Sequence, residues 1–245
     1  MSATLEERLL SVMDRKNHWA WPYFTRPGLT REQLLVHFRH ELHVYVRDFP
    51  VLLARVLGQG PPDDVRHALA ANIAEEQTGY LSFGVSHPEL FLRMMEGLGY
   101  TREQLLRPEP PLVPEAIAYR SFLDQVSIEP PWIVGAAVLT IFVEGSVHER
   151  AQREGRRKLP PVEEAIAEHP LVKFYGCPKE AMQLVRAHRA VEADHRDDAW
   201  RMVLGHAPKD AVGQERIVAA MEQALELWLR YRDGVARTIG LDAPR

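Results

Sequence analysis

The chain has little cysteine, no long apolar run and no excess of positive charge, and each of these absences excludes a class of protein. Its one cysteine, Cys177, cannot form an intramolecular disulfide, which fits a reducing compartment. The longest apolar run, Ile133 to Val143, is too short to cross a bilayer. The net charge is −4 with the basic residues scattered, so we expect neither nucleic acid nor a membrane as a partner.

The first residues also lack a targeting pattern. Met1 to Leu10 are polar and acidic, without the basic and then apolar order of a secretion signal. Together with the single cysteine, this predicts a cytoplasmic protein. A homodimer is the default expectation for its assembly.

Alternating β-strand patterns are missing too, and helical periodicity dominates the sequence. The 245 residues contain no repeat or linker, which predicts a single all-α domain over residues 1–245, a bundle of seven to eight helices. A connector at 155–177 with a short helix at 162–168 interrupts it. We expect the main helices at about 3–15, 31–58, 62–79, 88–98, 114–126, 132–154, 178–205 and 210–239.

The most informative segment lies in the predicted helix at 178–205. His188, Glu192 and His195 stand at i, i+4 and i+7, so a helix presents all three within about 60° of arc. Leu184 and Met202 extend the same face with apolar residues, as a buried stripe would, and we expect Arg189 and Arg196 on the opposite, solvated face. Two imidazoles and a carboxylate on a buried face form a natural half of a metal site, because an unpaired buried charge is expensive.

Two other predicted helices and one helix start supply the other half. Glu144 follows the apolar residues of the helix at 132–154, where a carboxylate needs a partner or a cation. Glu76 lies on a largely apolar face of the helix at 62–79, and His87 stands just before Pro88, at the N-terminal boundary of the next helix. The candidate ligands are therefore Glu76, His87, Glu144, His188, Glu192 and His195.

Three carboxylates and three imidazoles suit two divalent cations and non-haem iron chemistry with oxygen. Spacing alone also admits a mononuclear site or zinc. Each residue has a structural alternative: an inward histidine can be a hydrogen-bonded core residue, and Glu144 with His148 can be a simple i, i+4 helix pair.

At these residues the sequence resembles the haem-oxygenase-like diiron oxidases and oxygenases, the superfamily that includes pyrroloquinoline-quinone synthase C and thiaminase II. The matching pieces are Asn72-Ile73-Ala74-Glu75-Glu76, His87-Pro88-Glu89-Leu90-Phe91, Glu144-Gly145 and the final His188, Glu192 and His195. The resemblance implies that the six candidates bind two Fe²⁺ ions and that O₂ is a co-substrate. It implies hydroxylation, C–C cleavage or decarboxylation of an amino-acid-like or fatty-acid-like metabolite.

The chain departs from the family pattern at several positions. The acid of the last helix is usually Asp and is Glu192 here. The interval from Glu76 to His87 is about one residue longer than usual, which leaves Glu75 open as the ligand in place of Glu76. Val143 occupies the position of the tyrosine that the para-aminobenzoate synthase branch consumes, which argues against chemistry of that type.

Three competing classes remain. A cofactor-free oxidase like pyrroloquinoline-quinone synthase C would use His87, His148 and tyrosines as acid–base groups. A thiaminase II-like hydrolase needs a nucleophilic cysteine, for which Cys177 is the one candidate, although a lone cysteine is more often incidental. The third class is a protein that binds a metal or a partner without catalysis.

Some side chains could shape a substrate pocket. The aromatic Trp132, Phe142, Tyr175 and Trp200 are more readily explained as core, and the basic Arg153, Arg156, Arg157 and Lys158 as a solvated helix end.

Overall fold

The structure is a computed structural model that describes residues 3–107 and 109–243, without the side chains of 191–195. Within these residues every regular element is a helix, which confirms the all-α class. In the same part of the chain, no helix combines the length and the apolarity that crossing a bilayer requires.

Several helices lie where the sequence predicts them. They are α1 (Leu5–Met13), α5 (Asp63–Thr78), α6 (His87–Gly97), α8 (Pro114–Ile128), α11 (Val162–Ala167), α13 (Gln183–Gly205) and α14 (Ala211–Thr238), and a short helix, α7 (Arg102–Leu106), follows α6. Local hydrogen bonds fix several helix ends: Thr30 forms a capping box before the helix that begins at Arg31, Thr101 forms one before α7, and Gly79 ends α5 in the left-handed conformation.

The expected number of seven to eight helices is wrong for the described residues, because two long predicted helices are divided and the connector carries additional turns. Pro50, in the first turn of a new helix, separates the halves of the segment at 31–58. The additional pieces are α2 (Trp21–Phe24), α3 (Arg31–Glu41), the π-helical η1 (Leu42–Val46), α4 (Phe49–Leu57), α9 (Trp132–Ala136), the π-helical η2 (Ala137–Val143), α10 (Glu149–Arg153), α12 (Pro170–Tyr175) and the 3₁₀ turn η3 (Lys179–Ala181).

The helix predicted at 132–154 ends after Val143, so Glu144 and His148 are not an i, i+4 pair and that interpretation is wrong. Gly145 follows the end of the helix, and a Cβ at this position would lie 2.3 Å from the Ile141 carbonyl oxygen.

Lys16 binds the carbonyl oxygens that the end of this helix leaves without helical partners. Its ammonium donates to the carbonyl oxygens of Phe142, Val143 (3.2 Å) and Gly145 (2.6 Å). Burial, followed by the charge of Arg232, lowers the pKa of Lys16 to about 7.

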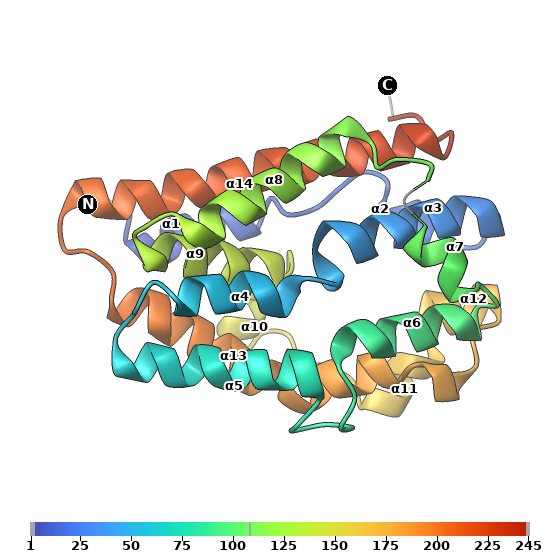
Figure 1. The fold of residues 1–245 in the computed structure, drawn as a ribbon, viewed down its shortest axis with the longest axis horizontal. Helices are drawn as coiled ribbons and strands as arrows, with labels where there is room; N and C mark the ends of the chain where they lie inside the picture. Colours follow the sequence, from blue (N-terminus) through green and yellow to red (C-terminus); the bar gives the residue numbers. More distant parts are fainter. Residues whose placement is uncertain (1–2, 108, 244–245) are drawn as a thin grey trace.

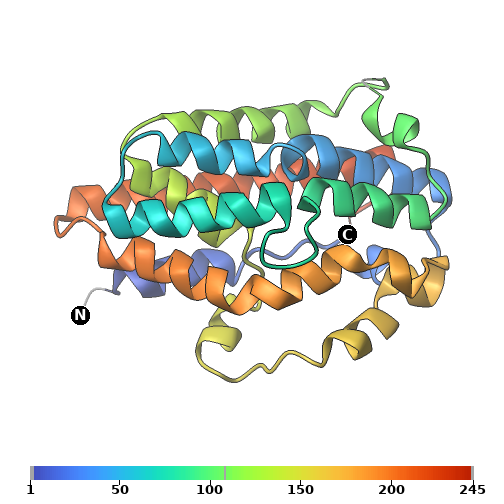
Figure 2. The ribbon, with the colours of Figure 1, turned by 60° about the horizontal axis from the view of Figure 1, so that its bottom comes forward.

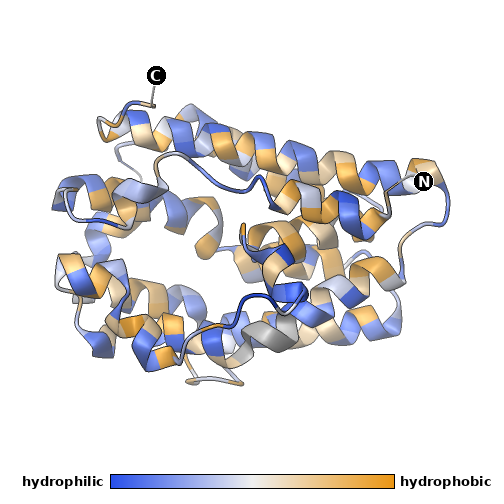
Figure 3. Ribbon diagram, turned by 180° about the vertical axis from the view of Figure 1, so that it is seen from behind, coloured by the Kyte–Doolittle hydropathy of each residue, from blue (hydrophilic) through white to orange (hydrophobic). Residues whose placement is uncertain are grey.

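The helices form an elongated bundle. Helices α8 and α14 run side by side along one long edge, and α5 leads into α6 along the other (Figure 1). The view in Figure 2 shows α13 running beside α5 and α6. Along the helices, hydrophobic and hydrophilic residues alternate, as in helices with one buried face (Figure 3).

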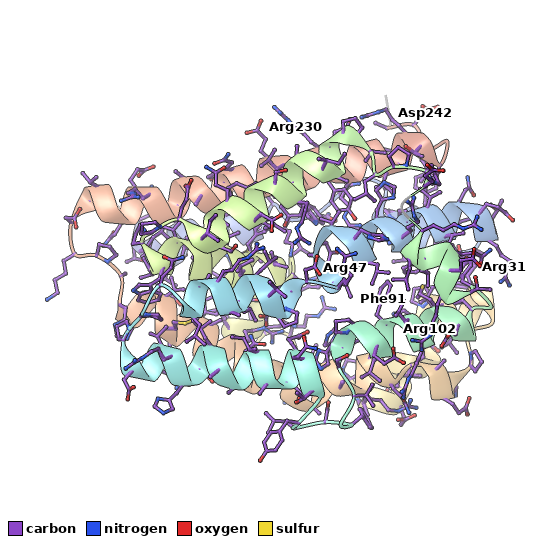
Figure 4. The ribbon with its side chains drawn as sticks, in the orientation of Figure 1. Arg31, Arg47, Phe91, Arg102, Arg230 and Asp242 are labelled. Carbon is purple, nitrogen blue, oxygen red and sulfur yellow. The ribbon has the colours of Figure 1, made fainter. Side chains whose placement is uncertain are left out.

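Two apolar clusters make up the core. One gathers around α1, α4, α8, η2 and α14, and the other joins α3 and α6 to the connector. In the second cluster Phe91 of α6, which Figure 4 labels, lies against Phe38 of α3, with ring centroids 6.2 Å apart. Helix α13 contributes to both clusters, with Leu184 to the second and Trp200 to the first.

We predict that Gly79→Ala destabilises the protein by about 3 kcal/mol, because it combines a left-handed φ of 64° with a Cβ that would lie 2.3 Å from the Val85 carbonyl oxygen. Gly84→Ala is the matched control in the same loop. Its φ is 66° and its Cβ would meet nothing within 4 Å, so backbone strain of about 1 kcal/mol is expected. Urea unfolding measures the free energy of unfolding of both variants. Equal losses would show that the contact with the Val85 carbonyl oxygen adds no cost.

Candidate metal centre

A cavity of about 420 Å³ lies between η1, η2, the junction of α5 with α6, and α13. Its wall combines apolar side chains with ionisable groups of both signs. The lining residues are Tyr45, Val46, Phe49, Glu76, His87, Thr140, Val143, Glu144, Gly145, Glu149, Leu184, Val185, His188, Arg189 and Arg196.

Glu76, His87 and His188 converge at this cavity. Each offers one ligand atom, and in the described residues these three atoms lie within 4.8 Å of one another. The His87 Nδ1 atom is 2.8 Å from Oε1 of Glu76, and the rings of His87 and His188 meet edge-on with centroids 4.9 Å apart. Three potential ligands from α5, α6 and α13 therefore face one point.

Local sequence explains how α5 and α6 present their side chains. Glu76 lies in the last turn of α5, and the left-handed Gly79 turns the chain immediately afterwards. Ser86 then caps α6 by accepting from the Glu89 amide, which places His87 at the first position of the new helix. The turn thus brings two residues that are 11 apart in sequence into hydrogen-bond distance.

Glu144 enters the same cavity from the end of η2. Its Oε1 accepts a hydrogen bond of 2.9 Å from Asn72 Nδ2. The carboxyl group is accessible from the cavity, but protein atoms surround it. This enclosure, followed by the charge of Glu76, raises the pKa of Glu144 to about 8, against the effect of Asn72.

His87 lies between two carboxylates. Burial lowers its pKa, but Glu76 and Glu75 together outweigh burial and raise the pKa above its ordinary value. Its Nε2 atom is 3.1 Å from Oε1 of Glu75, which is fully buried. Burial raises the pKa of Glu75, yet hydrogen bonds from Ser82, the Leu81 amide and His87 leave it lowered.

The structure places the six predicted ligands as follows. Glu76, His87 and His188 converge, and Glu144 lines the same cavity. The side chains of Glu192 and His195 lie outside the described residues, although the backbone of α13 is helical throughout that segment.

Two details of the predicted helix face are wrong. His188 is exposed at the cavity rather than buried in an apolar stripe. Arg189 and Arg196, expected on the solvated face, both line the cavity because long side chains reach around the helix.

The remaining candidates lie away from the cavity. Cys177 is packed in the second apolar cluster, and burial raises its pKa to about 11, the opposite of an activated thiolate. His148 occupies the N-cap position of α10 without a capping side-chain hydrogen bond, lies outside the lining, and has a pKa lowered by burial. The four aromatic residues pack against the core clusters, and Arg153 pairs with Glu6.

Sequence reasoning missed two groups in the wall. Glu149, only 1% exposed, accepts a hydrogen bond of 2.8 Å from Trp200 Nε1 and lies 3.3 Å from Arg196. Tyr45 donates to Glu41, which forms a buried ion pair with Arg232. The i, i+4 spacing of Glu41 and Tyr45 could have predicted their hydrogen bond. The position of Glu149 could not be predicted, because the helix expected at 132–154 ends after Val143.

The donor set fits iron. Carboxylate and imidazole groups from three helices surround one cavity, in the mixture that divalent iron accepts with open positions. The charge of Glu76 disfavours the ionised form of Glu144, and a divalent cation in the cavity would offset that effect.

We predict that the metal-free protein loses stability relative to its Glu144→Gln variant as pH rises from about 5 to 9. The folded pKa of about 8 lies above the ordinary value of 4.5, so the folded chain holds a proton that the unfolded chain releases in this window. Thermal unfolding at several pH values with a chelator present measures the difference. If the unfolding temperatures of the two proteins changed in parallel with pH, the prediction that the fold raises the pKa of Glu144 would be wrong.

Comparison with known proteins agrees with the fold. Over 96% of the chain, the structure superposes with a TM-score of 0.69 on a domain of unknown function with a haem-oxygenase-like fold from Shewanella denitrificans, at 19% identity and 91% coverage of that chain. A TenA homologue from Pseudomonas syringae pv. tomato gives the same TM-score at 14% identity, covering 96% of this chain and 98% of that one. The fold is therefore haem-oxygenase-like, and no curated protein sequence matches the chain.

The family is established by sequence. Residues 36–229, which include every candidate ligand, match the family described as iron-containing redox enzymes. The match runs from α3 into α14 and so takes in all the elements that surround the cavity. The chain belongs to the family of iron-containing redox enzymes.

Proposed function

We propose that the protein is a non-haem diiron oxidase or oxygenase that uses O₂ to oxidise or cleave a small metabolite of amino-acid or fatty-acid type. The observation that carries the proposal is the convergence of Glu76, His87 and His188 beside Glu144 in one cavity. Membership in a family of iron-containing redox enzymes supports both the metal and the class of reaction.

Glu76, His87, Glu144 and His188 would hold the iron, with Glu192 and His195 of α13 completing the six ligands. Bound iron would supply the electrons and open coordination positions that the reaction with O₂ requires. Binding would also displace the proton that Glu144 retains near neutral pH, because only the carboxylate is a ligand.

The rest of the cavity wall would bind the substrate. Val46, Phe49, Leu184 and Val185 give the wall apolar surface that would accept the carbon skeleton. Arg196, which is within 3.3 Å of Glu149, adds a positive charge to the wall. A small molecule with an apolar body and a polar end fits this combination.

We predict that Glu76→Gln and His188→Ala each weaken Fe²⁺ binding by at least about 100-fold, since loss of a ligand exceeds the 10–100-fold effect of an outer partner. Anaerobic equilibrium dialysis of Fe²⁺ measures the affinity, and an oxygen electrode then follows O₂ uptake with candidate substrates. His67→Ala is the matched control, because His67 is an exposed histidine on the same helix as Glu76. Wild-type protein that binds no iron, or consumes no O₂ when loaded, would contradict the proposal.

The same measurements distinguish an iron-dependent oxidase from the cofactor-free alternative. Full activity after exhaustive chelation, retained in both His188→Ala and Glu144→Ala, would favour an acid–base oxidase instead. A thiaminase-like hydrolase has less support, because Cys177 is buried outside the cavity and its pKa is raised to about 11.

A further inference from the structure

We propose that Glu75 positions His87 and does not bind the metal: it accepts a hydrogen bond from His87 Nε2–H, so that Nδ1 faces the cation. This inference rests on the proposed metal centre. It assigns different roles to two adjacent carboxylates, both of which contact the same imidazole ring.

The hydrogen bonds of Glu75 are those of a fixed acceptor. Its side chain is fully buried, and its Oε2 accepts a hydrogen bond of 2.6 Å from the Leu81 amide. Its Oε1 accepts from the Ser82 hydroxyl at 2.5 Å and lies 3.1 Å from His87 Nε2. Three donors therefore hold this carboxylate, which leaves it poorly placed to turn toward a cation.

The other side of the His87 ring faces the candidate ligands. Nδ1 lies 2.8 Å from Glu76, and the described ligand atoms that converge belong to Glu76, His87 and His188, without Glu75. The two nitrogens of an imidazole point in different directions. A cation shared with Glu76 and His188 would therefore reach Nδ1, while Nε2 keeps its proton for Glu75. Metal-binding histidines commonly donate their second ring N–H to a carboxylate in this way.

Glu75 also ties a loop to the metal centre. Leu81 and Ser82 belong to the segment at 79–86 that joins α5 to α6, and its outer face exposes Tyr80 and Phe83. The segment donates inward to Glu75 through one amide and one hydroxyl. The same carboxylate thus fixes both the ring of His87 and the loop that precedes it.

Zinc is a suitable probe, since it binds carboxylate and imidazole without O₂ chemistry. We predict that Glu75→Gln binds Zn²⁺ 10–100-fold more weakly than the wild type, measured by competition with a chromophoric chelator. A glutamine has one acceptor oxygen in place of two, so it cannot serve the three donors together. Glu75→Asp keeps the charge and should recover part of the affinity.

Ser82→Ala is the matched control. It removes one hydrogen bond to Glu75 and leaves the carboxylate facing His87 Nε2, so its zinc affinity should stay within about threefold of the wild type. Thermal unfolding of the metal-free variants verifies that each is folded.

A spectroscopic readout separates positioning from a general structural effect. In zinc-loaded protein labelled with ¹⁵N-histidine, with His87 assigned by its loss in His87→Asn, we expect Nδ1 to carry the zinc and Nε2 to retain a slowly exchanging proton. Glu75→Gln should lose the slow exchange, and Ser82→Ala should keep it.

Three results would overturn the inference. They are zinc bound to Nε2 of His87, a loss of zinc affinity in Glu75→Gln as large as that in Glu76→Gln, and a zinc affinity of Glu75→Gln equal to that of the wild type. The outcome is independent of the oxygen chemistry. A protein that binds zinc as described but consumes no O₂ with iron would refute the oxidase proposal and leave the role of Glu75 intact.

Discussion

The electrostatic cost of ionising Glu144 beside Glu76 in one cavity is the constraint on which the rest of the site depends. Desolvation by the surrounding protein, followed by the charge of Glu76, raises the pKa of Glu144 to about 8. Asn72 offsets part of that cost with a hydrogen bond to Glu144, and His87 lies within hydrogen-bond distance of both Glu76 and Glu75. The folded chain retains an arrangement that is expensive without a cation, which is typical of a binding site rather than of a structural core.

The backbone around Glu144 is built to hold this arrangement. The helix ends at the position where the carboxylate enters the cavity, and Gly145 allows the chain to leave without a steric clash. The buried ammonium of Lys16 binds the carbonyl oxygens at this end, so the break does not leave buried acceptors without donors. A residue from the first 20 of the chain thereby stabilises a segment more than 120 residues away.

Local signals made much of the fold predictable. Capping boxes at Thr30 and Thr101 and the left-handed Gly79 fix helix ends through hydrogen bonds within a few residues, which a sequence displays directly. The break after Val143 is accompanied by hydrogen bonds from the distant Lys16, which local periodicity does not display, so the sequence predicted a continuous helix. The sequence also singled out Glu76, His87, Glu144 and His188, which line one cavity, but it could not show that Glu149, Arg189 and Arg196 share that cavity.

Helix α13 has a further mechanical consequence. One end packs in the cluster of α3 and α6, the other packs in the cluster of α8 and α14, and His188 faces the cavity in between. A cation held jointly by α5, α6 and α13 would act as a cross-link between the two halves of the core. Binding of the cation would then raise the cooperativity with which the whole bundle unfolds, because the two core clusters could no longer unfold independently.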